Sequence, residues 1–459
     1  MKVKDNQSKY FSLRNNYPFF CFENLNVEKQ EGKLIISFEF NLNNSFTFKP
    51  KLEFPLREFY IHFEPDHPAM QNFAFQLGMI ELISYWKAGC APVVIIKPFK
   101  LNEEQIRWWK KLYYHGLGEF FYLNGIEAGP EDFMMIKNTS AAVPEKPKCT
   151  LSDKTIVPVG GGKDSVVTLE LFKASDNELI PFVINPNRAQ TKTIENAGFS
   201  LKDCIHVRRT IDPELLRLNR KGFLNGHTPF SAVVAFNSVL GAYLSGARYV
   251  ALSNESSANE ATIPGTKINH QYSKSFEFEK DFRDYIKTEL CDEIEYFSFL
   301  RPLNELQISS LFAGLKHQHA DFRSCNKGSK NGAWCGRCPK CLFTYIMLTP
   351  FLDKKKLIGI FGKDMLNDQG LLQYFRELSG LDNTKPFECV GTIDEVNAAL
   401  KQAAQKQGGK LPELLRYYTD QIADVSSEGF YKLLKSTDEQ NFLPVKFEEI
   451  LNKAGGWTD

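Results

Sequence analysis

Alternation between apolar and polar positions dominates the first part of the chain. Residues 33–40 (KLIISFEF) and 45–48 (SFTF) alternate with the period of two expected for strands that have one buried face. Asn43 and Asn44 between them are typical of a tight turn, so we expect an antiparallel β-pair. The predicted elements that follow are a helix at 68–86, a short buried strand at 93–96 and a helix at 102–122 that opens with an N-cap residue.

From residue 155 the pattern changes to short apolar runs that alternate with helical segments. Such alternation is typical of a parallel sheet with helices on both faces, in which ligands bind beyond the carboxyl ends of the strands. The fold class is therefore predicted to be α/β, with a doubly wound parallel sheet. The predicted strands are 156–159, 180–184, 204–207 and 248–253, and the predicted helices are 165–173 and 229–245.

Composition divides the chain into four parts. Residues 129–154 lose periodicity and carry Pro, Lys and Ser, as linkers do. Helical spacing predominates in the tail, at 393–407, 411–422, 429–434 and 446–453. We therefore expect an N-terminal α+β domain at 1–128, a linker at 129–154, a doubly wound domain at 155–384 and a mostly helical region at 385–459.

Charge and cysteine content narrow the class of protein. The chain of 459 residues has a formal net charge of +1, which gives no global electrostatic case for a nucleic-acid or membrane partner. We see no apolar run near the length of about 20 residues that a bilayer requires, and no secretory signal at the start. Ten partly clustered cysteines favour a reducing cytoplasm over a disulfide framework. We expect a cytoplasmic protein without an obligate protein partner.

The run at 156–159 leads into a glycine-rich turn with the sequence GGGKDS. Three glycines let the backbone turn tightly and bring its N–H groups close to an anion. A lysine and a serine follow at the start of a helix, where the helix dipole favours negative charge. The turn is therefore predicted to hold phosphate. The candidate nucleotide-binding residues are Gly160, Gly161, Gly162, Lys163, Asp164 and Ser165, with Asn185 after the second strand near the adenine or ribose.

This turn differs from the common phosphate-binding motifs. A Walker A loop needs Ser or Thr directly after the lysine, and here Asp164 follows it. GGGKDS instead resembles the PP-loop (SGGxDS) of the N-type ATP pyrophosphatases, with Gly160 in place of the usual Ser. The resemblance implies an adenine nucleotide alpha hydrolase-like domain that splits ATP into AMP and pyrophosphate. The adenylyl group would pass to a substrate oxygen.

Four cysteines are clustered with the spacing C-x9-C-x2-C-x2-C. Four soft ligands within 17 residues suit a tetrahedral structural Zn²⁺, and the overlapping CxxCxxC also fits an iron–sulfur cluster. Neighbouring Arg337 and Lys340 help to hold thiolates. We expect zinc, with iron–sulfur or uncomplexed thiols as the alternatives. The candidate metal ligands are Cys325, Cys335, Cys338 and Cys341, whereas Cys21, Cys90, Cys149, Cys204 and Cys291 are expected to be ordinary core or surface residues.

An ordered series of rare sequence blocks resembles one family. The match covers about residues 116–391, and it is weaker in the N-terminal region and in the stretch PNRAQTKTIENAGF. Together the blocks are similar to the MurL family of ATP-dependent UDP-N-acetylmuramoyl-L-alanyl-L-glutamate epimerases of peptidoglycan precursor synthesis. The blocks are GLGEFFYLNG, GGGKDS, NRKGFLNGH, SNES, IPGTKINHQYSK, LRPLNEL, Ser324–Asn326, Trp334–Cys341 and KPFECVG.

The resemblance implies inversion of the terminal L-Glu of the UDP-linked dipeptide to D-Glu. Removing an α-proton beside a free carboxylate would place a carbanion next to an existing negative charge. Adenylation of the α-carboxylate removes that charge, which explains why an isomerisation would consume ATP. The loop with Lys163 and Ser165 would hold the triphosphate, and Asp164 with Mg²⁺ would help to neutralise the departing pyrophosphate.

Epimerisation also needs groups that move a proton and groups that receive the substrate. One group must take the α-proton and the opposite face must be reprotonated. The candidates for proton transfer are His270, Lys274, Cys389 and His227, with Cys325 as a further thiol. A UDP-sugar peptide carries phosphates and carboxylates, so cations in or beside the family blocks are candidates to receive it. Asn254 and Glu255 are added because they follow the fourth predicted strand, close to the same cleft. The candidate substrate-binding residues are Arg220, Asn225, Asn254, Glu255, Lys267 and Arg301.

Three other functions are compatible with parts of the pattern. A PP-loop amidoligase resembling 7-cyano-7-deazaguanine synthase would also combine the loop with a CxxCxxC cluster, but that family is much shorter. A tRNA sulfur-transfer enzyme would carry an iron–sulfur cluster and a basic RNA-binding face, which the net charge of +1 does not favour. An ATP-binding scaffold with an inactive loop is disfavoured because Lys163, Asp164 and Ser165 occur together.

Overall fold

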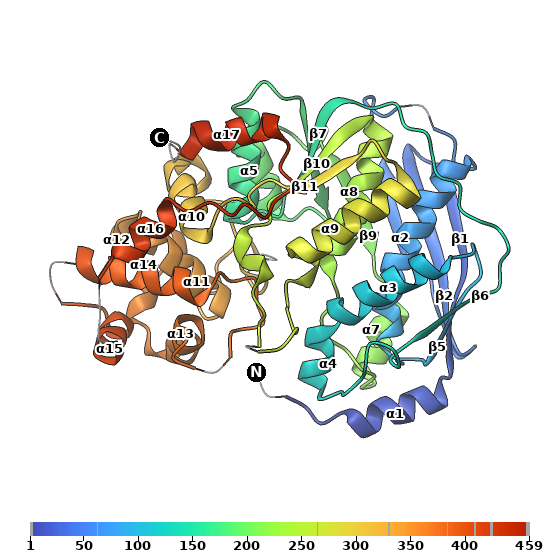
Figure 1. The fold of residues 1–459 in the computed structure, drawn as a ribbon, viewed down its shortest axis with the longest axis horizontal. Coiled ribbons are helices and arrows are strands. Elements are labelled where there is room, and N and C mark those ends of the chain that lie inside the picture. Colours follow the sequence, from blue (N-terminus) through green and yellow to red (C-terminus); the bar gives the residue numbers. More distant parts are fainter. Residues whose placement is uncertain are drawn as a thin grey trace. The chain divides into compact units, whose positions relative to one another are not determined.

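The structure, a computed structural model, describes residues 3–61, 63–263, 265–328, 331–382, 384–407, 410–422 and 426–455. Its residues form two compact units that alternate along the chain (Figure 1). Unit 1 comprises Met1–Lys154, Ile205–Val250 and Lys267–Glu295, and unit 2 comprises Thr155–Cys204, Ala251–Thr266 and Tyr296–Asp459.

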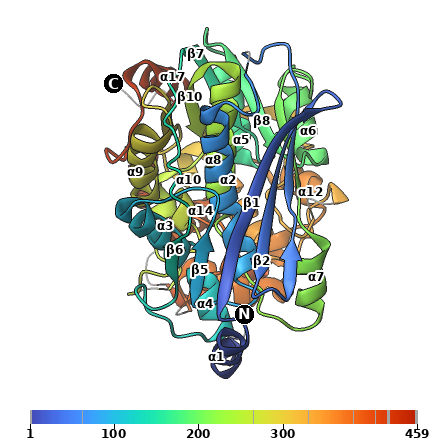
Figure 2. The same ribbon diagram turned by 90° about the vertical axis from the view of Figure 1, so that its right-hand side faces the viewer.

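Unit 1 is built on a mixed sheet with the strand order β9-β4-β2-β1-β5-β6. The pairs β9–β4, β4–β2 and β2–β1 are antiparallel, whereas β1–β5 and β5–β6 are parallel. Figure 2 shows the long strands β1 and β2 side by side. The strands are β1 (Phe19–Gln30), β2 (Lys33–Leu42), β3 (Phe46–Phe48), β4 (Lys51–Pro55), β5 (Val93–Ile96), β6 (Met135–Asn138) and β9 (Ile205–Thr210).

The predicted β-pair is confirmed as β2 and β3. The two strands pair antiparallel with Leu42 opposite Phe46, and Asn43 and Asn44 between them have φ angles of 49° and 55°. Both turn residues are therefore in the left-handed region that short side-chain amides tolerate. The prediction missed β1, whose register shifts between Phe22 and Asn24 and so breaks the regular alternation.

Helices of unit 1 cover this sheet. The predicted helix at 68–86 is confirmed as α2, which packs against β1, β2 and α8 and is buried along almost its whole length. The predicted helix at 102–122 is instead two helices, which are separated at Leu117 with a φ angle of −97° and a ψ angle of 7°. Gly116, the last residue of the first helix, packs so tightly on Pro229 that a Cβ would lie 2.7 Å from the proline ring. The α-helices are α1 (Gln7–Asn16), α2 (Pro68–Trp86), α3 (Glu103–Gly116), α4 (Gly118–Asn124), α7 (Pro213–Arg220), α8 (Phe230–Ser245) and α9 (Phe276–Tyr285).

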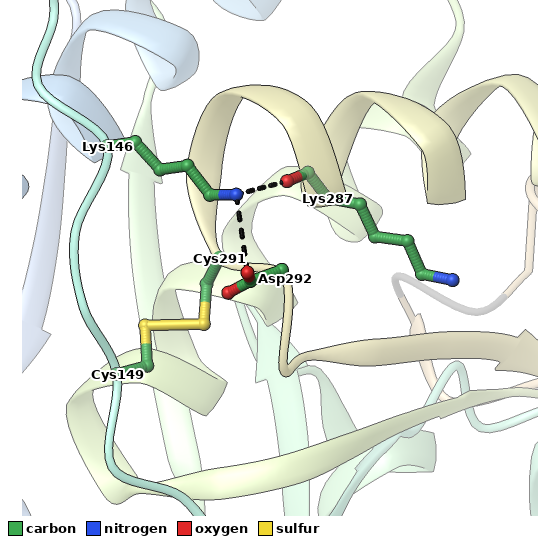
Figure 3. Close-up of a disulfide and its surroundings, with 5 residues drawn as sticks. All are labelled: Lys146, Cys149, Lys287, Cys291 and Asp292. Carbon is green, nitrogen blue, oxygen red and sulfur yellow. Dashed lines mark hydrogen bonds and ion pairs between the residues drawn. A yellow bond between two sulfur atoms is a disulfide. The ribbon is translucent and has the colours of Figure 1, made fainter.

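Two features lie in the segment that the sequence assigned to a linker. Its residues 135–138 form β6, because the apolar run before Lys137 pairs with β5 and so satisfies its backbone groups. Further along, Cys149 is joined to Cys291 by a disulfide, which corrects the expectation that both are ordinary core or surface thiols (Figure 3). The Lys146 ammonium donates to the carbonyl of Lys287 at 2.6 Å beside this link.

Unit 2 contains the carboxyl ends of strands in the order β11-β10-β7-β8. β7 and β8 pair in parallel, and α5 connects them along the chain, as the sequence predicted. The α/β class is therefore confirmed. The strands are β7 (Ser152–Pro158), β8 (Leu179–Ile184), β10 (Ala247–Leu252) and β11 (Glu295–Ser298), and the adjoining helices are α5 (Lys163–Lys173) and α6 (Arg188–Asn196).

The remainder of unit 2 is helical, and the predicted helices of the tail are confirmed within a few residues at their ends. α11, α13 and α14 pack against one another, and α14 also contacts α16. Among the described residues, none of the helices has the length and apolar character needed to cross a bilayer. The helices are α10 (Glu305–Gly314), α11 (Pro339–Leu348), α12 (Lys354–Phe361), α13 (Leu372–Ser379), α14 (Ile393–Lys406), α15 (Glu413–Gln421), α16 (Glu428–Leu434) and α17 (Val445–Gly455).

Candidate active site

The glycine loop of unit 2 lies at the carboxyl end of β7 and leads directly into α5. Gly161 has a φ angle of 79°, and a Cβ there would lie 3.0 Å from the backbone nitrogen of Gln190. A Cβ on Gly162 would lie 2.8 Å from the Ser324 hydroxyl oxygen. The loop thus requires glycine at 161 for its backbone conformation and glycine at 162 for its close packing.

Ser165 holds this loop in its turned conformation. Its hydroxyl oxygen accepts from the N–H of Gly161 and donates to the carbonyl of Gly162, both at 3.0 Å. Gly162 is the N-cap of α5, so the first N–H groups of the helix follow the glycines directly. A tight turn that opens a helix in this way is a common anion-binding arrangement.

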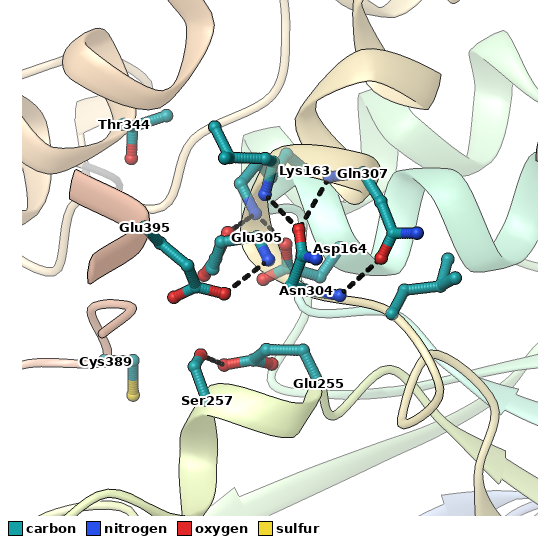
Figure 4. Close-up of polar contacts among 12 residues, drawn as sticks. Lys163, Asp164, Glu255, Ser257, Asn304, Glu305, Gln307, Thr344, Cys389 and Glu395 are labelled. Atoms are coloured by element: carbon teal, nitrogen blue, oxygen red, sulfur yellow. Dashed lines mark hydrogen bonds and ion pairs between the residues drawn. The ribbon is translucent and has the colours of Figure 1, made fainter. Parts of the chain in front are cut away.

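Lys163 contacts two carboxylates beside the loop. Its side chain is 3% exposed, and its ammonium forms ion pairs with Asp164 and with Glu305 of α10 (Figure 4). Burial alone would lower the pKa of Lys163, but the charges of Asp164 and Glu305 raise it above its ordinary value. Lys163 is therefore an ammonium cation at every physiological pH.

Two more buried carboxylates surround this pair. Glu395 of α14 accepts from the backbone N–H of Glu305 at 2.9 Å. Glu255, at the end of β10, accepts from the Ser257 hydroxyl at 3.3 Å. Burial raises the pKa values of Glu305 and Glu395 above their ordinary range, and the positive charge of Lys163 opposes this rise at Glu305. Oxygen-rich clusters of this kind are the ligand sets that Mg²⁺ takes beside phosphates.

Glu305 and Glu395 were absent from the sequence prediction. Glu305 lies in the block LRPLNEL, where Asn304 and Gln307 form a capping box, and the local pattern indicates only a helix start. Its side chain reaches Lys163 across 142 residues of sequence. The signal that could have identified Glu305 as a candidate was its position in a family block, directly after the N-cap Asn304.

The structure also places Arg301 and Asn254, predicted to bind substrate, and Asn185, predicted to bind the nucleotide, in unit 2. Arg301 is fully buried and donates to the backbone carbonyl of Glu255 at 2.6 Å. Asn254 donates to the Ser298 hydroxyl at 3.0 Å. Asn185 directly follows β8 with a φ angle of 46°. Arg301 and Asn254 therefore hydrogen-bond to groups of the chain itself near the carboxyl ends of the strands.

The cysteine cluster comes together in unit 2 as the spacing predicted. The Sγ–Sγ distances are 3.6 Å for Cys325–Cys338, 3.6 Å for Cys335–Cys341 and 3.4 Å for Cys338–Cys341. Tetrahedral thiolates with Zn–S bonds of about 2.3 Å lie about 3.8 Å apart. The N–H of Gly328 donates to Cys325 Sγ at 3.2 Å, as backbone groups around metal thiolates do. The four residues fit a metal ion, so Cys325 belongs to this cluster.

Cys389, the other thiol candidate, is half-buried in the loop before α14. Its backbone carbonyl accepts from the Lys340 ammonium. The positive charge of Lys340 also acts on Glu305: it lowers the pKa of that carboxyl and so opposes the larger, opposite effect of burial. Cys389 thus belongs to the same polar surroundings of unit 2 as the carboxylates.

In unit 1, three further ionisable side chains meet. Nδ1 of His270 lies 2.5 Å from Glu119 Oε2, and Nδ1 of His227 lies 3.5 Å from the same oxygen. The two imidazole rings are 4.5 Å apart between centroids. The structure thus brings together His227 and His270, both predicted, and adds Glu119, which the sequence analysis assigned no role.

The other predicted residues of unit 1 are more exposed. Lys267 lines a cavity of about 730 Å³ together with Gly118, Phe121 and Tyr122. Arg220 is the exposed last residue of α7. Asn225 is also exposed, and its Oδ1 accepts from the following N–H at 2.9 Å. Lys274 ends a short 3₁₀ turn, four residues after His270.

Comparison with known protein families gives two matches along the chain, and their boundaries differ from those of units 1 and 2. The MurL N-terminal domain matches residues 12–299, and the MurL C-terminal domain matches residues 321–430. The chain belongs to the MurL family. The resemblance predicted from the sequence blocks is therefore confirmed. The glycine loop and Glu119 lie in the MurL N-terminal match, whereas the four clustered cysteines and Cys389 lie in the MurL C-terminal match.

Three relatives carry the same name, UDP-N-acetyl-alpha-D-muramoyl-L-alanyl-L-glutamate epimerase. The protein of Xanthomonas oryzae pv. oryzae is 34% identical over 363 residues, which cover 77% of this chain and 79% of the relative. The protein of Micromonospora sp. is 34% identical over 361 residues, 76% of this chain and 78% of the relative. The protein of Salinispora tropica is 33% identical over 358 residues, which cover 76% of this chain and 77% of the relative.

Proposed function

We propose that this protein is an ATP-dependent epimerase that converts the terminal L-Glu of UDP-MurNAc-L-Ala-L-Glu to D-Glu, with release of AMP and pyrophosphate, during peptidoglycan precursor synthesis. The observation that carries the proposal is the identity of 33–34% to three epimerases along about three quarters of the chain. The glycine loop and the buried Lys163 support the ATP dependence.

The chemistry requires activation before the proton can leave. The α-carboxylate of the substrate is an anion, and a carbanion beside it would be strongly disfavoured. ATP supplies an AMP group that caps this carboxylate and removes its charge, so that the carbonyl can accept the electron pair of the C–H bond. The step needs a site that binds a triphosphate and orients its α-phosphorus toward a carboxylate oxygen.

The loop offers the groups that such a site needs. Its backbone N–H groups and the N-terminus of α5 attract phosphate oxygens, and Lys163 adds a positive charge. Gly160 is exposed at the surface of the loop. Asn185, just beyond β8, would contact the adenosine.

Mg²⁺ would be held by Asp164 and Glu305, with Glu255 and Glu395 as further buried carboxylates nearby. The ion would supply positive charge that neutralises the pyrophosphate as it departs. The thiolates of the cysteine cluster would hold Zn²⁺ and so fix the segment that leads into α11. An iron–sulfur cluster takes the same ligands, and metal analysis with a visible absorption spectrum separates the two.

Candidate residues for proton transfer and for substrate binding complete the proposal. His270, His227, Lys274 and Cys389 are the candidates to move the α-proton. Lys267 lines the cavity of unit 1 and would receive an anionic part of the substrate. The remaining candidates for substrate contact are Arg220, Asn225, Asn254, Glu255 and Arg301.

The test is the configuration of the product glutamate. Purified protein is incubated with UDP-MurNAc-L-Ala-L-Glu and Mg²⁺, with and without ATP, and the acid hydrolysate is analysed on a chiral column. We expect D-Glu only with ATP, together with AMP. Lys163→Ala and Asp164→Ala should abolish both products, whereas Lys173→Ala, at the exposed end of α5, should not.

Three outcomes would contradict the proposal or a part of it. Absence of D-Glu under all conditions would remove the epimerase function, and ammonia-dependent AMP formation would favour an amidoligase. Full activity of both loop variants would remove the glycine loop from the reaction.

A further inference from the structure

The cluster of Glu119, His227 and His270 joins three distant segments of unit 1. Glu119 lies on α4, and its side chain is 10% exposed. His270 is 151 residues away in sequence, and its side chain is 11% exposed. Such burial of a carboxylate and a hydrogen-bonded imidazole shows a specific contact rather than a solvated surface pair.

The same two segments line the cavity of unit 1. Gly118, Phe121 and Tyr122 of α4 flank Glu119 and face the cavity, and Lys267 and Ile268 precede His270 on the other wall. The two walls are in contact, because a Cβ on Gly118 would lie 3.7 Å from Ile268 Cγ2. The pair of Glu119 and His270 is therefore built into the segments that form the cavity.

The Glu119 contact defines the protonation of the His270 ring. A carboxylate oxygen 2.5 Å from Nδ1 accepts a hydrogen bond from it. In the neutral ring the proton then resides on Nδ1, and Nε2 carries the lone pair that can take a proton. When Nε2 is protonated, the negative charge of Glu119 stabilises the resulting imidazolium.

His227 differs from His270 in its electrostatic surroundings. Burial, with the positive charges of His270, Lys87 and Lys274, lowers the pKa of His227 to about 3. His227 is therefore neutral when the protein works. Its ring centroid is 4.5 Å from that of His270, and its Nδ1 lies 3.5 Å from Glu119 Oε2, against 2.5 Å for His270. His270 is therefore the ring that Glu119 orients more closely.

The same three side chains also have the composition of a metal site, because their ligand atoms lie within 4.8 Å of one another. One observation disfavours a metal ion. The ammonium groups of Lys87 and Lys274 act electrostatically on His227, and their charge would repel a dication.

We propose that Glu119 is the positioning residue that makes His270 the proton-transfer group on one face of the substrate α-carbon. This inference rests on the proposed epimerase function. When His270 acts as the base, Nε2 takes the α-proton, and the electron pair of the C–H bond passes into the carbonyl of the activated carboxyl group. The imidazolium is balanced by Glu119. In the reverse direction Nε2 returns the proton to the same face.

Glu119→Gln tests the charge of the carboxylate, because the amide keeps its size and one acceptor oxygen. We expect kcat to fall about 10²-fold, with KM for both substrates changed less than about threefold, since a positioned acid–base group contributes about 10²–10⁴-fold. Glu119→Asp keeps the charge and should recover part of kcat. Glu131→Gln is the matched control, because Glu131 is an exposed glutamate of the same unit whose side chain is 86% exposed.

A spectroscopic measurement tests the contact without relying on activity. In ¹⁵N-histidine-labelled protein, the His270 resonances are assigned by their loss in His270→Gln. We expect Nδ1 of His270 to be protonated in the wild-type protein, and the pH at which Nε2 loses its proton to fall in Glu119→Gln.

The outcomes separate this inference from the proposed function. A wild-type protein that makes no D-Glu contradicts the function, whereas the ¹⁵N measurement still reports on the contact. An active wild-type protein with unchanged kcat and pH profile in Glu119→Gln overturns the positioning role. An unprotonated Nδ1 of His270 overturns it as well. So does a tightly bound metal ion, in addition to that of the cysteine cluster, that is lost in His227→Gln and Glu119→Gln.

Discussion

At the scale of single residues, the site is organised by charges buried in pairs. Lys163 is held by Asp164 and Glu305, and a triphosphate with its Mg²⁺ would compete for both partners of this contact. His270 is held by Glu119 in the same manner. Buried ionic groups are stable only when paired and hydrogen-bonded. Lys163 and His270 therefore each depend on a carboxylate, Glu305 and Glu119 respectively, that comes from a distant part of the chain.

Local spacing was sufficient to predict Lys163, Asp164 and Ser165, because they follow the glycines directly. Their partners could not be predicted in this way. Glu305 is 142 residues from Lys163, and Glu119 is 151 residues from His270. Periodicity indicates which face of a helix is buried, but it does not indicate which distant side chain lies against it.

The buried neutral His227 makes stability depend on pH. Its pKa falls from 6.5 to about 3 on folding, so the unfolded chain binds more protons below pH 6.5. The stabilising contribution is therefore complete above about pH 6.5 and is lost as the pH falls toward 3. We expect His227→Gln to flatten the decrease in unfolding free energy over this range, measured by urea denaturation.

The exposed His67, the N-cap of α2, replaced by Asn, which also caps helices, is the control for that measurement. Its substitution should leave the shape of the pH profile unchanged. A His227→Gln profile parallel to that of the wild-type protein would contradict a buried neutral imidazole.

At the scale of elements, the junction between β7 and α5 is set by contacts that the sequence does not display. The glycines indicate a tight turn, but only the structure shows that Gly162 packs against Ser324. Similarly, the amphipathic pattern at 102–122 predicts one helix, whereas the structure has two, α3 and α4, separated at Leu117. Helix and strand types are thus predictable from periodicity, whereas breaks that depend on remote residues are not.

Gly162→Ala tests this packing. The added Cβ would lie 2.8 Å from the Ser324 hydroxyl oxygen but 3.5 Å from Ser324 Cβ, so the hydroxyl causes the clash. We expect the single variant to lose about 1–3 kcal/mol of unfolding free energy and to bind ATP more weakly. Gly162→Ala with Ser324→Ala should recover both properties, measured by denaturant unfolding and nucleotide titration. Equal losses in the single and double variants would refute the packing argument.

At the scale of the whole molecule, units 1 and 2 are each assembled from three separate runs of the chain. Strand β9, which follows α6 in sequence, pairs with β4 of the first run. Pattern reading proceeds along the chain, so it recovered the α/β class but could not recover which runs associate. The linear division at 128, 154 and 384 remains a prediction.

The cysteine cluster links 17 residues of unit 2 and includes the start of α11. We expect about one Zn²⁺ per chain by elemental analysis. Removal of the ion by a strong chelator should lower Tm by about 5 °C or more, because the ligands lose the bonds that hold them together. Zinc should restore Tm, whereas calcium should not. A visible iron–sulfur absorption band, or an unchanged Tm after complete removal of metal, would contradict a structural zinc site.

The most direct test of the central claim is the α-hydrogen of the product glutamate. The protein is incubated in D₂O with UDP-MurNAc-L-Ala-L-Glu, Mg²⁺ and ATP, and the glutamate is separated by configuration and analysed by mass spectrometry. Because the α-proton leaves to the protein and the new one comes from exchangeable groups, the D-Glu formed should carry one α-deuterium, and only when ATP is present. D-Glu that retains its α-protium, or that forms without ATP, would contradict the account.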